Sequence, residues 1–207
     1  MTQDSAFPVP PVAMNVATRP EDRSGESQLP DLMVRYQQGD SVAVEELIRW
    51  LSPYLMRFFA AAGGGTGEAE DLFQECWIRI HRSRHTYRPS EPLLPWIFAI
   101  ARHTKLDGWR RRRRRESREV LMESLPDAPS SEKEAAAPNE NFERLLKYLP
   151  DSQREVILML KVSGMSLEDV ARATSSTVGA IKQKAHRAYA TLRGILEKEG
   201  SSQCQQK

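Results

Sequence analysis

Apolar side chains recur every three or four residues along most of this chain, which is the pattern of amphipathic helices. A short first helix is expected from Asp31 to Gly39, and a longer one begins at Ser41, with Pro53 able to kink or split it. A third helix is expected over residues 68–84. Its predicted inward side chains are Ala69, Leu72, Phe73, Cys76, Trp77 and Ile80. The alternation typical of strands is nearly absent, so the pattern predicts an all-α fold.

The next helix begins at Pro95, which suits a first helical turn, and ends in the arginine run Arg110–Arg115. Its candidate core residues are Trp96, Ile97, Ala99, Ile100 and Leu106, and the residues left for its surface are Arg102, His103, Lys105 and Trp109. Cations with interleaved aromatic rings suit single-stranded DNA, because cations bind phosphates and rings stack on unpaired bases. Two plainer interpretations stay open: Trp96 belongs to the core, and the arginine run is an unspecific polybasic segment.

A helix-turn-helix is predicted near the C-terminus. Ser166 and Asp169 can form a capping box that opens a short helix, and Thr177 can cap the helix that follows the break at residues 174–177. Ser175 lies where such turns often carry Gly to reach a left-handed backbone conformation, so this turn is expected to be costlier than usual. In this motif the second helix fits the major groove of DNA.

The second helix of this motif has two contrasting faces. One is an apolar stripe of Val178, Ile181, Ala185, Ala188, Tyr189 and Leu192. The polar residues that lie off this stripe are Lys182, Gln183, Lys184, His186 and Arg187, and no acidic residue interrupts them. Such a face suits a polyanion, whereas for an isolated helix a solvated cationic face is the simpler interpretation.

Charge is strongly segregated, although the net charge of the chain is only +2. Residues 79–115 hold twelve Lys/Arg against two Asp/Glu, and residues 144–207 hold eleven against six. Residues 116–143 between them hold two against eight, and residues 29–78 hold three against eight. Two basic modules separated by an acidic connector indicate two contacts with one polyanion.

Together these patterns predict two small helical domains joined by a flexible linker. The expected divisions are a disordered N-terminal extension at 1–28, a first domain at 29–115, an acidic linker at 116–140, a helix-turn-helix domain at 141–197 and a polar tail at 198–207. The 207-residue length is consistent with one or two domains.

No catalytic constellation is recognisable. The two cysteines, Cys76 and Cys204, have no metal-ligand spacing, and the four histidines have none either. The glycine-rich stretch 63–67 lacks the Lys and Ser/Thr of a phosphate loop. We therefore expect no enzyme, no cofactor and no metal site. There is no secretory signal and no apolar run long enough to cross a membrane, so a cytoplasmic protein without direct membrane insertion is expected.

Four blocks of the chain resemble the extracytoplasmic-function (group four) sigma factors of bacterial RNA polymerase, which belong to the sigma-70 family. The blocks read DLMVRYQQGDSVAVEELIRWLSPYL at 31–55, AEDLFQECWIRIHR at 69–82, PWIFAIARHTKLDGWRRRRR at 95–114 and LPDSQREVILMLKVSGMSLEDVARATSSTVGAIKQKAHRAYATLR at 149–193. They resemble the opening helices, the polymerase-clamp-binding helix, the −10-element helix and the −35-element domain, in that order.

The resemblance implies a sigma factor that binds core RNA polymerase, directs it to promoters and assists promoter melting. It implies polymerase contacts at Asp71, Gln74 and Glu75. It implies −35 contacts at Thr177, Lys182, Gln183, Lys184, His186 and Arg187. It implies −10 contacts at Trp96, Arg102, His103, Lys105, Trp109, Arg110, Arg111 and Arg114. The sequence departs from the family pattern at His103, where the family often has Asn. Thr177, Ala180 and Lys184 replace the more usual Ser, Thr and Arg, which keeps the cationic face and is expected to alter the preferred −35 sequence.

The resemblance also implies three partners: core polymerase, promoter DNA and an anti-sigma factor, which in turn could hold the protein at the inner membrane. Two other functions explain the sequence less completely. A repressor or activator with a helix-turn-helix explains residues 149–193 but leaves the block 69–115 unexplained. A small nuclease would need a carboxylate cluster for two metals, which the sequence lacks.

Overall fold

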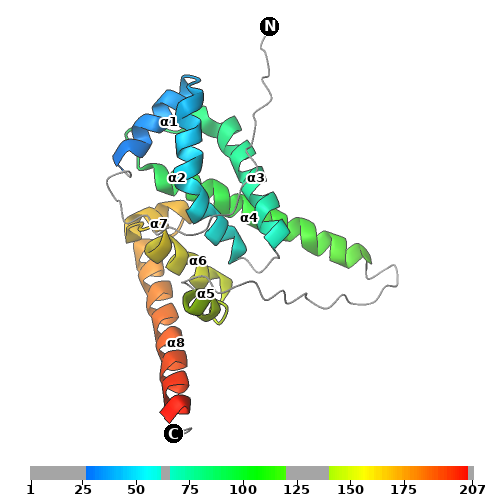
Figure 1. Cartoon of the computed structure of the whole chain (residues 1–207), viewed down its shortest axis with the longest axis vertical. Helices are drawn as coiled ribbons and strands as arrows, with labels where there is room; N and C mark the ends of the chain where they lie inside the picture. The colour runs from blue at the N-terminus through cyan, green and yellow to red at the C-terminus, as the bar shows by residue number, and fades with distance from the viewer. Residues whose placement is uncertain (1–26, 62–65, 120–139, 205–207) are drawn as a thin grey trace.

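The computed structural model describes residues 27–61, 66–119 and 140–204, and every regular element in these ranges is helical (Figure 1). The elements are α1 (Leu29–Gln37), α2 (Ser41–Ala60), α3 (Thr66–Ser83), the 3₁₀ turn η2 (Arg84–Thr86), α4 (Leu93–Glu119), α5 (Glu140–Leu146), α6 (Asp151–Ile157), the π-helical turn η3 (Leu158–Val162), α7 (Leu167–Ala173) and α8 (Val178–Cys204). The predicted all-α fold is confirmed. Residues 1–26 of the expected disordered extension and most of the acidic linker lie outside the described residues, and α4 continues four residues past the expected boundary at 115.

Helices α1 to α4 form an N-terminal bundle. The side chain of Asp40 caps α2 by accepting hydrogen bonds from the backbone amides of Val42 and Ala43, at 2.9 and 3.2 Å. Pro53 does not split α2, which runs unbroken from Ser41 to Ala60. The long α2 therefore presents one continuous apolar face to α3 and α4.

The core of this bundle is aromatic. Its largest fully buried side chains are Phe58 and Phe59 of α2, Phe73 and Trp77 of α3, and Phe98 of α4. The rings of Phe58 and Phe98 meet edge to face with centroids 5.4 Å apart, which is a favoured aromatic geometry. All six inward positions predicted for α3 are buried.

The predicted core face of α4 was only partly right. Ile97 is buried as expected, but Trp96, Ala99, Ile100 and Leu106 are half-buried. The fully buried positions at the centre of the helix are instead Phe98, Ala101 and Thr104. The buried face is turned because α4 packs against α3 on one side and against α7 on another, so that small and polar side chains also lie inside.

The helix-turn-helix of α7 and α8 has the local chemistry that the sequence predicted. The Ser166 hydroxyl accepts from the Asp169 amide at 3.1 Å, and the Asp169 carboxylate accepts from the Ser166 amide at 3.4 Å, completing the capping box. The Thr177 hydroxyl accepts from the Ala180 amide at 3.2 Å. Ser175 adopts the expected left-handed conformation with φ of 50°.

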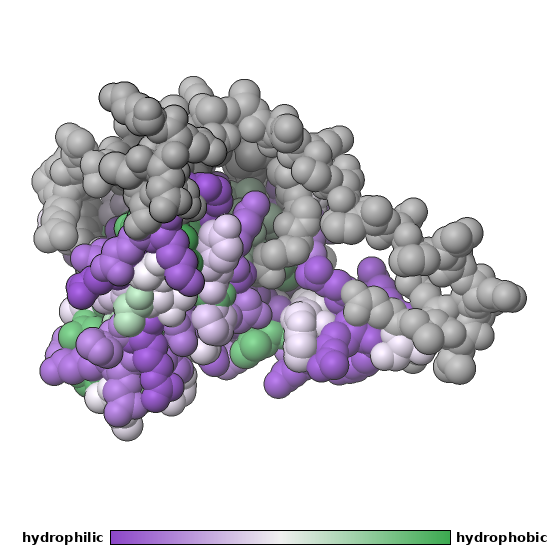
Figure 2. All heavy atoms as spheres, turned by 90° about the horizontal axis from the view of Figure 1, so that it is seen from below, coloured by the Kyte–Doolittle hydropathy of each residue, from purple (hydrophilic) through white to green (hydrophobic). Residues whose placement is uncertain are grey.

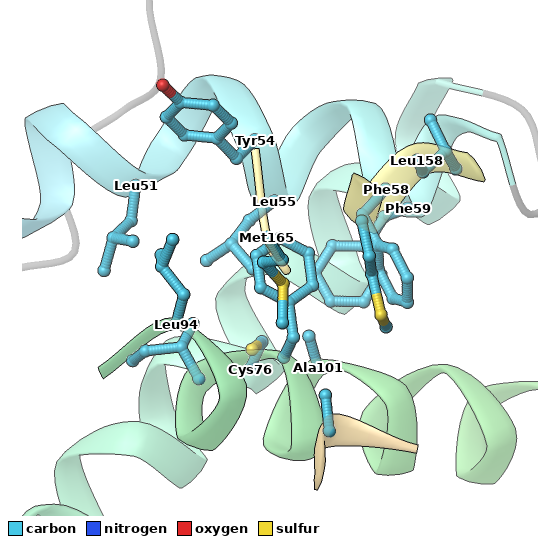
Figure 3. Packing of buried hydrophobic residues seen from close by; sticks show 14 of the residues in the cluster. Leu51, Tyr54, Leu55, Phe58, Phe59, Cys76, Leu94, Ala101, Leu158 and Met165 are labelled. Carbon is cyan, nitrogen blue, oxygen red and sulfur yellow. The ribbon is translucent and has the colours of Figure 1, made fainter. Parts of the chain in front are cut away.

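The C-terminal helices pack directly on the N-terminal bundle. Helix α7 lies against α4 and η3 lies against α2, while α8 projects away from the bundle (Figure 1). Met165, just before α7, sits between the side chains of α2 and α4 (Figure 3). Met165 and Leu158 are each only 4% exposed, so a single apolar core runs through both halves of the protein.

Replacing Ser175 by Gly should stabilise the fold. A left-handed residue with a Cβ costs about 1–2 kcal/mol, and the greater freedom of Gly in the unfolded chain offsets about 0.5–1 kcal/mol of that gain. We expect the free energy of unfolding, measured by urea denaturation, to rise by about 0.5–1 kcal/mol. Ser175→Ala retains the Cβ and should give no gain; equal stabilisation by both variants would contradict this account.

Candidate nucleic-acid interface

The exposed face of α8 is cationic and is held in place by a buried apolar face. Ile181, Ala185 and Ala188 are at most 7% exposed and anchor the helix on α6 and α7. The candidate −35 residues lie on the other side: Thr177, Lys182, Gln183, His186 and Arg187 are exposed, and Lys184 is half-buried. The structure thus brings all six together along the first three turns of one helix.

Tyr189 was predicted for the apolar stripe but is 39% exposed. The Lys161 ammonium lies 5.9 Å from the centre of its ring. The partly exposed ring therefore has a cation from η3 within cation–π range of its face.

One side of α4 carries two arginines, one half-buried and one exposed, and an exposed ring. Arg102, Trp109 and Arg113 follow one another at helical spacings of seven and four residues, so they share one side of the helix. The Arg113 guanidinium lies 4.8 Å from the centre of the Trp109 ring, which is 49% exposed. Arg113 was expected only as part of the arginine run. Its spacing of four from Trp109 was the signal that could have singled it out.

Arg102 and Lys105, both predicted for the surface, are instead covered by the C-terminal helices. The Glu155 carboxylate of α6 lies 3.3 Å from Arg102 Nε and 3.6 Å from Lys105 Nζ. The Lys105 ammonium also lies 5.0 Å from the centre of the Phe58 ring, and its side chain is only 16% exposed. A salt bridge across the two halves of the protein therefore occupies two candidate −10 residues.

The other candidate −10 residues are spread around α4. His103, Arg110, Arg111 and Arg114 are exposed. Arg110 pairs with Asp107 at 3.4 Å, and Arg112, on another side of the helix, pairs with Glu68 of α3. The Trp96 ring is half-buried, 5.6 Å from the Tyr87 ring, and packs against the core. The structure thus gathers the cations on one helix but not on one face of it.

The candidate polymerase-binding residues share an outer face of α3. Asp71 and Gln74 are exposed, while Glu75 is half-buried and accepts a hydrogen bond from Arg79 Nε at 2.8 Å. Ile78 belongs to the same face because it follows Gln74 by four residues, and it is 40% exposed. An exposed isoleucine among polar groups was missed in the sequence, although it stood off the apolar stripe of its helix.

Arg79 links this face of α3 to α4. Besides Glu75 it binds Asp107, with Nη1 2.7 Å from Oδ2. The hydrogen bond from Arg79 lowers the pKa of Asp107, and the nearby positive charges of Arg79, Arg110 and Arg111 act in the same direction. The pair therefore sets the crossing of the two helices that carry the candidate polymerase and DNA contacts.

Seen from the end of α8, the described surface is predominantly hydrophilic, with small separated apolar patches (Figure 2). Within the described ranges no three His, Cys, Asp or Glu side chains are arranged to hold a metal ion. None of the helices there combines the length and the apolar content needed to traverse a lipid bilayer.

Comparison with known proteins gives a consistent result. Residues 43–115 match Sigma-70 region 2 and residues 139–192 match Sigma-70, region 4. The chain is 30% identical over 168 residues to the ECF RNA polymerase sigma factor SigF of Caulobacter vibrioides, covering 81% of this chain and 93% of that protein. It is 29% identical over 171 residues to the RNA polymerase sigma factor CarQ of Myxococcus xanthus, covering 79% and 95% respectively.

Solved structures show the same fold. CnrH, in complex with the cytosolic domain of CnrY, superposes with a TM-score of 0.62 at 21% identity, over 82% of this chain and 97% of that one. The sigma factor RpoE of Bartonella quintana, in complex with the anti-sigma factor NepR, superposes with a TM-score of 0.60 at 26% identity, over 74% and 96%.

Two sigma-70 regions in this order, one ending in a helix-turn-helix, define a transcription initiation factor of the sigma-70 class. Within that class, the chain belongs to the extracytoplasmic-function (ECF) RNA polymerase sigma factors. It binds core RNA polymerase and directs the enzyme to promoters. A simple repressor would leave the match of residues 43–115 unexplained.

Replacing Asp107 by Asn should lower stability in a pH-dependent manner. The folded pKa of Asp107 is depressed, so its pairing with Arg79 contributes above the unfolded pKa of about 3.9 and is lost as the pH falls through the lower folded value. Because the pair is partly exposed, we expect a loss of at most about 1 kcal/mol at pH 7 by urea denaturation. The difference from wild type should shrink below about pH 4. An equal deficit at both pH values would show that packing, and not the charge, is responsible.

Proposed function

We propose that this ECF sigma factor recognises the −35 element with α8 and the −10 region with α4, and that it docks on core polymerase through the outer face of α3. The observation that carries the proposal is the anchored α8 helix, whose exposed face presents Lys182, Gln183, His186 and Arg187 and carries no acidic residue between 178 and 193. A helix-turn-helix places such a face in the major groove, where Lys and Arg bind guanine edges and phosphates.

The role of α4 follows from its mixture of cations and an accessible ring. Exposed arginines bind phosphates without regard to sequence, and the Trp109 ring backed by Arg113 offers a flat surface on which an unpaired base can stack. Arg102 and Lys105 belong to the same surface when the C-terminal helices are displaced from α4. The cations and the exposed ring of α4 support a role in binding the single strand, and the polar face of α8 supports a role in sequence recognition.

The outer face of α3 combines two features of a protein interface. It carries an exposed apolar side chain, Ile78, beside the exposed polar side chains of Asp71 and Gln74. An apolar centre within a polar rim is the usual anatomy of a docking surface. This supports assignment of the face to core polymerase.

We further propose that the protein acts in the cytoplasm, where core polymerase and DNA are found, and that it initiates transcription without being a catalyst itself. An anti-sigma factor is a fitting partner, because the RpoE structure that this chain resembles was solved with one. If that anti-sigma factor is a membrane protein, the sigma factor would be held at the inner membrane without inserting into it.

Lys184→Ala and Arg187→Ala test the role of α8. Loss of a base contact should weaken promoter binding by the reconstituted holoenzyme by about 1–3 kcal/mol and relax preference at one position. Loss of a phosphate contact should weaken binding uniformly and reduce the salt slope by about one unit. Arg49→Ala, which removes an exposed cation from α2, serves as the control. Unchanged promoter binding and run-off transcription in both α8 variants would refute the assignment.

Asp71→Lys combined with Gln74→Lys tests the docking face. Both side chains are exposed, so helix content should stay unchanged, while affinity for core polymerase should fall by roughly tenfold, or about 1.4 kcal/mol. Fluorescence anisotropy of labelled protein titrated with core measures this. Glu75 is left intact because it binds Arg79. Wild-type affinity in the double variant, with Glu45→Lys on α2 as the matched control, would place the docking surface elsewhere.

A further inference from the structure

Two candidate DNA contacts of α4 are occupied by a residue of the other half of the protein. The Glu155 carboxylate lies 3.3 Å from Arg102 Nε and 3.6 Å from Lys105 Nζ, and Glu155 is only 8% exposed. A carboxylate placed between an arginine and a lysine has the charge and hydrogen-bonding capacity of a DNA phosphate at the same position. The two anions cannot share the site.

The neighbouring residue fixes Glu155 in this position. Arg154 donates from Nη1 to the carbonyl of Ala61, at the end of α2, over 2.6 Å. The same guanidinium donates to the carbonyls of Leu146, Lys147 and Leu149, at 2.9, 3.4 and 2.9 Å. It thereby ties the start of α6 both to its own domain and to the carbonyl of Ala61, the residue that ends α2 as its C-cap. Glu155, one residue on, is carried to α4.

The contact of Glu155 with Arg102 and Lys105 is incomplete in its hydrogen bonding. Arg102 Nε and Glu155 Oε1 are both buried, and neither has a hydrogen-bond partner of good geometry among the described residues. Charges removed from water without full hydrogen bonding recover only part of their desolvation cost. Apolar packing of Met165 between α2 and α4 therefore holds the closed arrangement, and the ion pair adds a contact that another anion can replace (Figure 3).

We propose that Glu155 is an internal competitor of DNA phosphate, which keeps Arg102 and Lys105 closed in the free protein until α6 and α7 leave α4. This inference rests on the proposed −10 role of α4. It gives the free sigma factor low affinity for single-stranded DNA, since affinity falls in proportion to the fraction of open molecules. Displacement of the C-terminal helices on core polymerase then exposes the cations where the −10 strand is present.

The test is Glu155→Gln in the full-length chain, with Glu168→Gln on the exposed surface of α7 as a control that loses the same charge. Dyes attached at Glu45→Cys in α2 and Arg193→Cys in α8 report the separation of the two halves by energy transfer, with Cys204→Ser in all samples. Cys76 is buried and its burial raises the pKa of its thiol to about 12, so it should not react with the dyes. A fluorescein-labelled thymidine oligonucleotide of about a dozen nucleotides, a length typical of single-strand sites, reports DNA binding.

We expect Glu155→Gln to lower energy transfer and to bind the oligonucleotide about tenfold more tightly, as a shift from a mostly closed to a mostly open population requires. Glu168→Gln should match wild type in both measurements. Unchanged energy transfer and unchanged binding in Glu155→Gln overturn the proposal, and so does opening without a gain in binding. Run-off transcription by holoenzyme carrying Arg102→Gln and Lys105→Gln tests the −10 assignment separately. Wild-type transcription would show that the −10 assignment itself has failed, whereas reduced transcription would leave that assignment standing even if the proposal for Glu155 fails.

If circular dichroism shows that Glu155→Gln does not fold, the same contact is removed by replacing its two cations on α4. Arg102→Gln with Lys105→Gln removes both cations while leaving Glu155 in place, and these side chains lie at the rim of the interface, 30% and 16% exposed. The energy transfer of this double variant should fall as well. Wild-type energy transfer in it overturns the proposal without reference to DNA.

Discussion

Burial of apolar side chains in the seam between α2 and α4 is the interaction on which the arrangement of the two halves depends. Met165 leaves water on entering this seam and Leu158 of η3 packs against α2, and a buried side chain of this size is worth about 1.5–3 kcal/mol. Because this force has no direction, it brings the halves together without setting their register. The register comes from the polar groups at the edges of the seam.

Those polar groups are satisfied to different degrees. Arg154 binds four carbonyl oxygens, including that of Ala61 across the seam. Glu155 faces two cations yet has a buried oxygen without a well-formed hydrogen bond. A well-satisfied guanidinium beside a poorly satisfied carboxylate gives the seam one edge that resists separation and one that tolerates it.

The sequence predicted local structure well and long-range contacts poorly. The capping box of Ser166 and Asp169 and the left-handed Ser175 depend on a few neighbouring residues, and the structure confirms both. The buried face of α4 was misplaced because Ala101 and Thr104 become core only where α3 and α7 meet the helix, which no spacing within the helix reveals.

The candidate DNA-binding residues show the same difference between what local sequence predicts and what depends on long-range packing. The outer face of α8 could be predicted because one periodic stripe fixes which side is buried. The covering of Arg102 and Lys105 could not, because Glu155 is some fifty residues away in the chain and looks like an ordinary acid of an amphipathic helix. Whether a cation is accessible is a property of what packs over it, and α4 is long enough to pass under another part of the chain.

Several cations of α4 therefore already have an anionic partner, so DNA binding there is an exchange of a carboxylate for a phosphate. The free-energy cost of that exchange is lower at Arg110 than at Arg102, which lies nearer the N-terminus of α4. At Arg110 the partner Asp107 is exposed, and such a pair is worth at most about 1 kcal/mol. At Arg102 the exchange also requires the apolar seam to open, because Glu155 cannot leave without α6. A DNA strand that first binds the arginines of residues 110–115 displaces only weakly held carboxylates. The free energy needed to separate α6 and α7 from α4 is required only when the strand extends toward Lys105 and Arg102. The order of contacts along α4 is in this way set by which carboxylates the fold has buried.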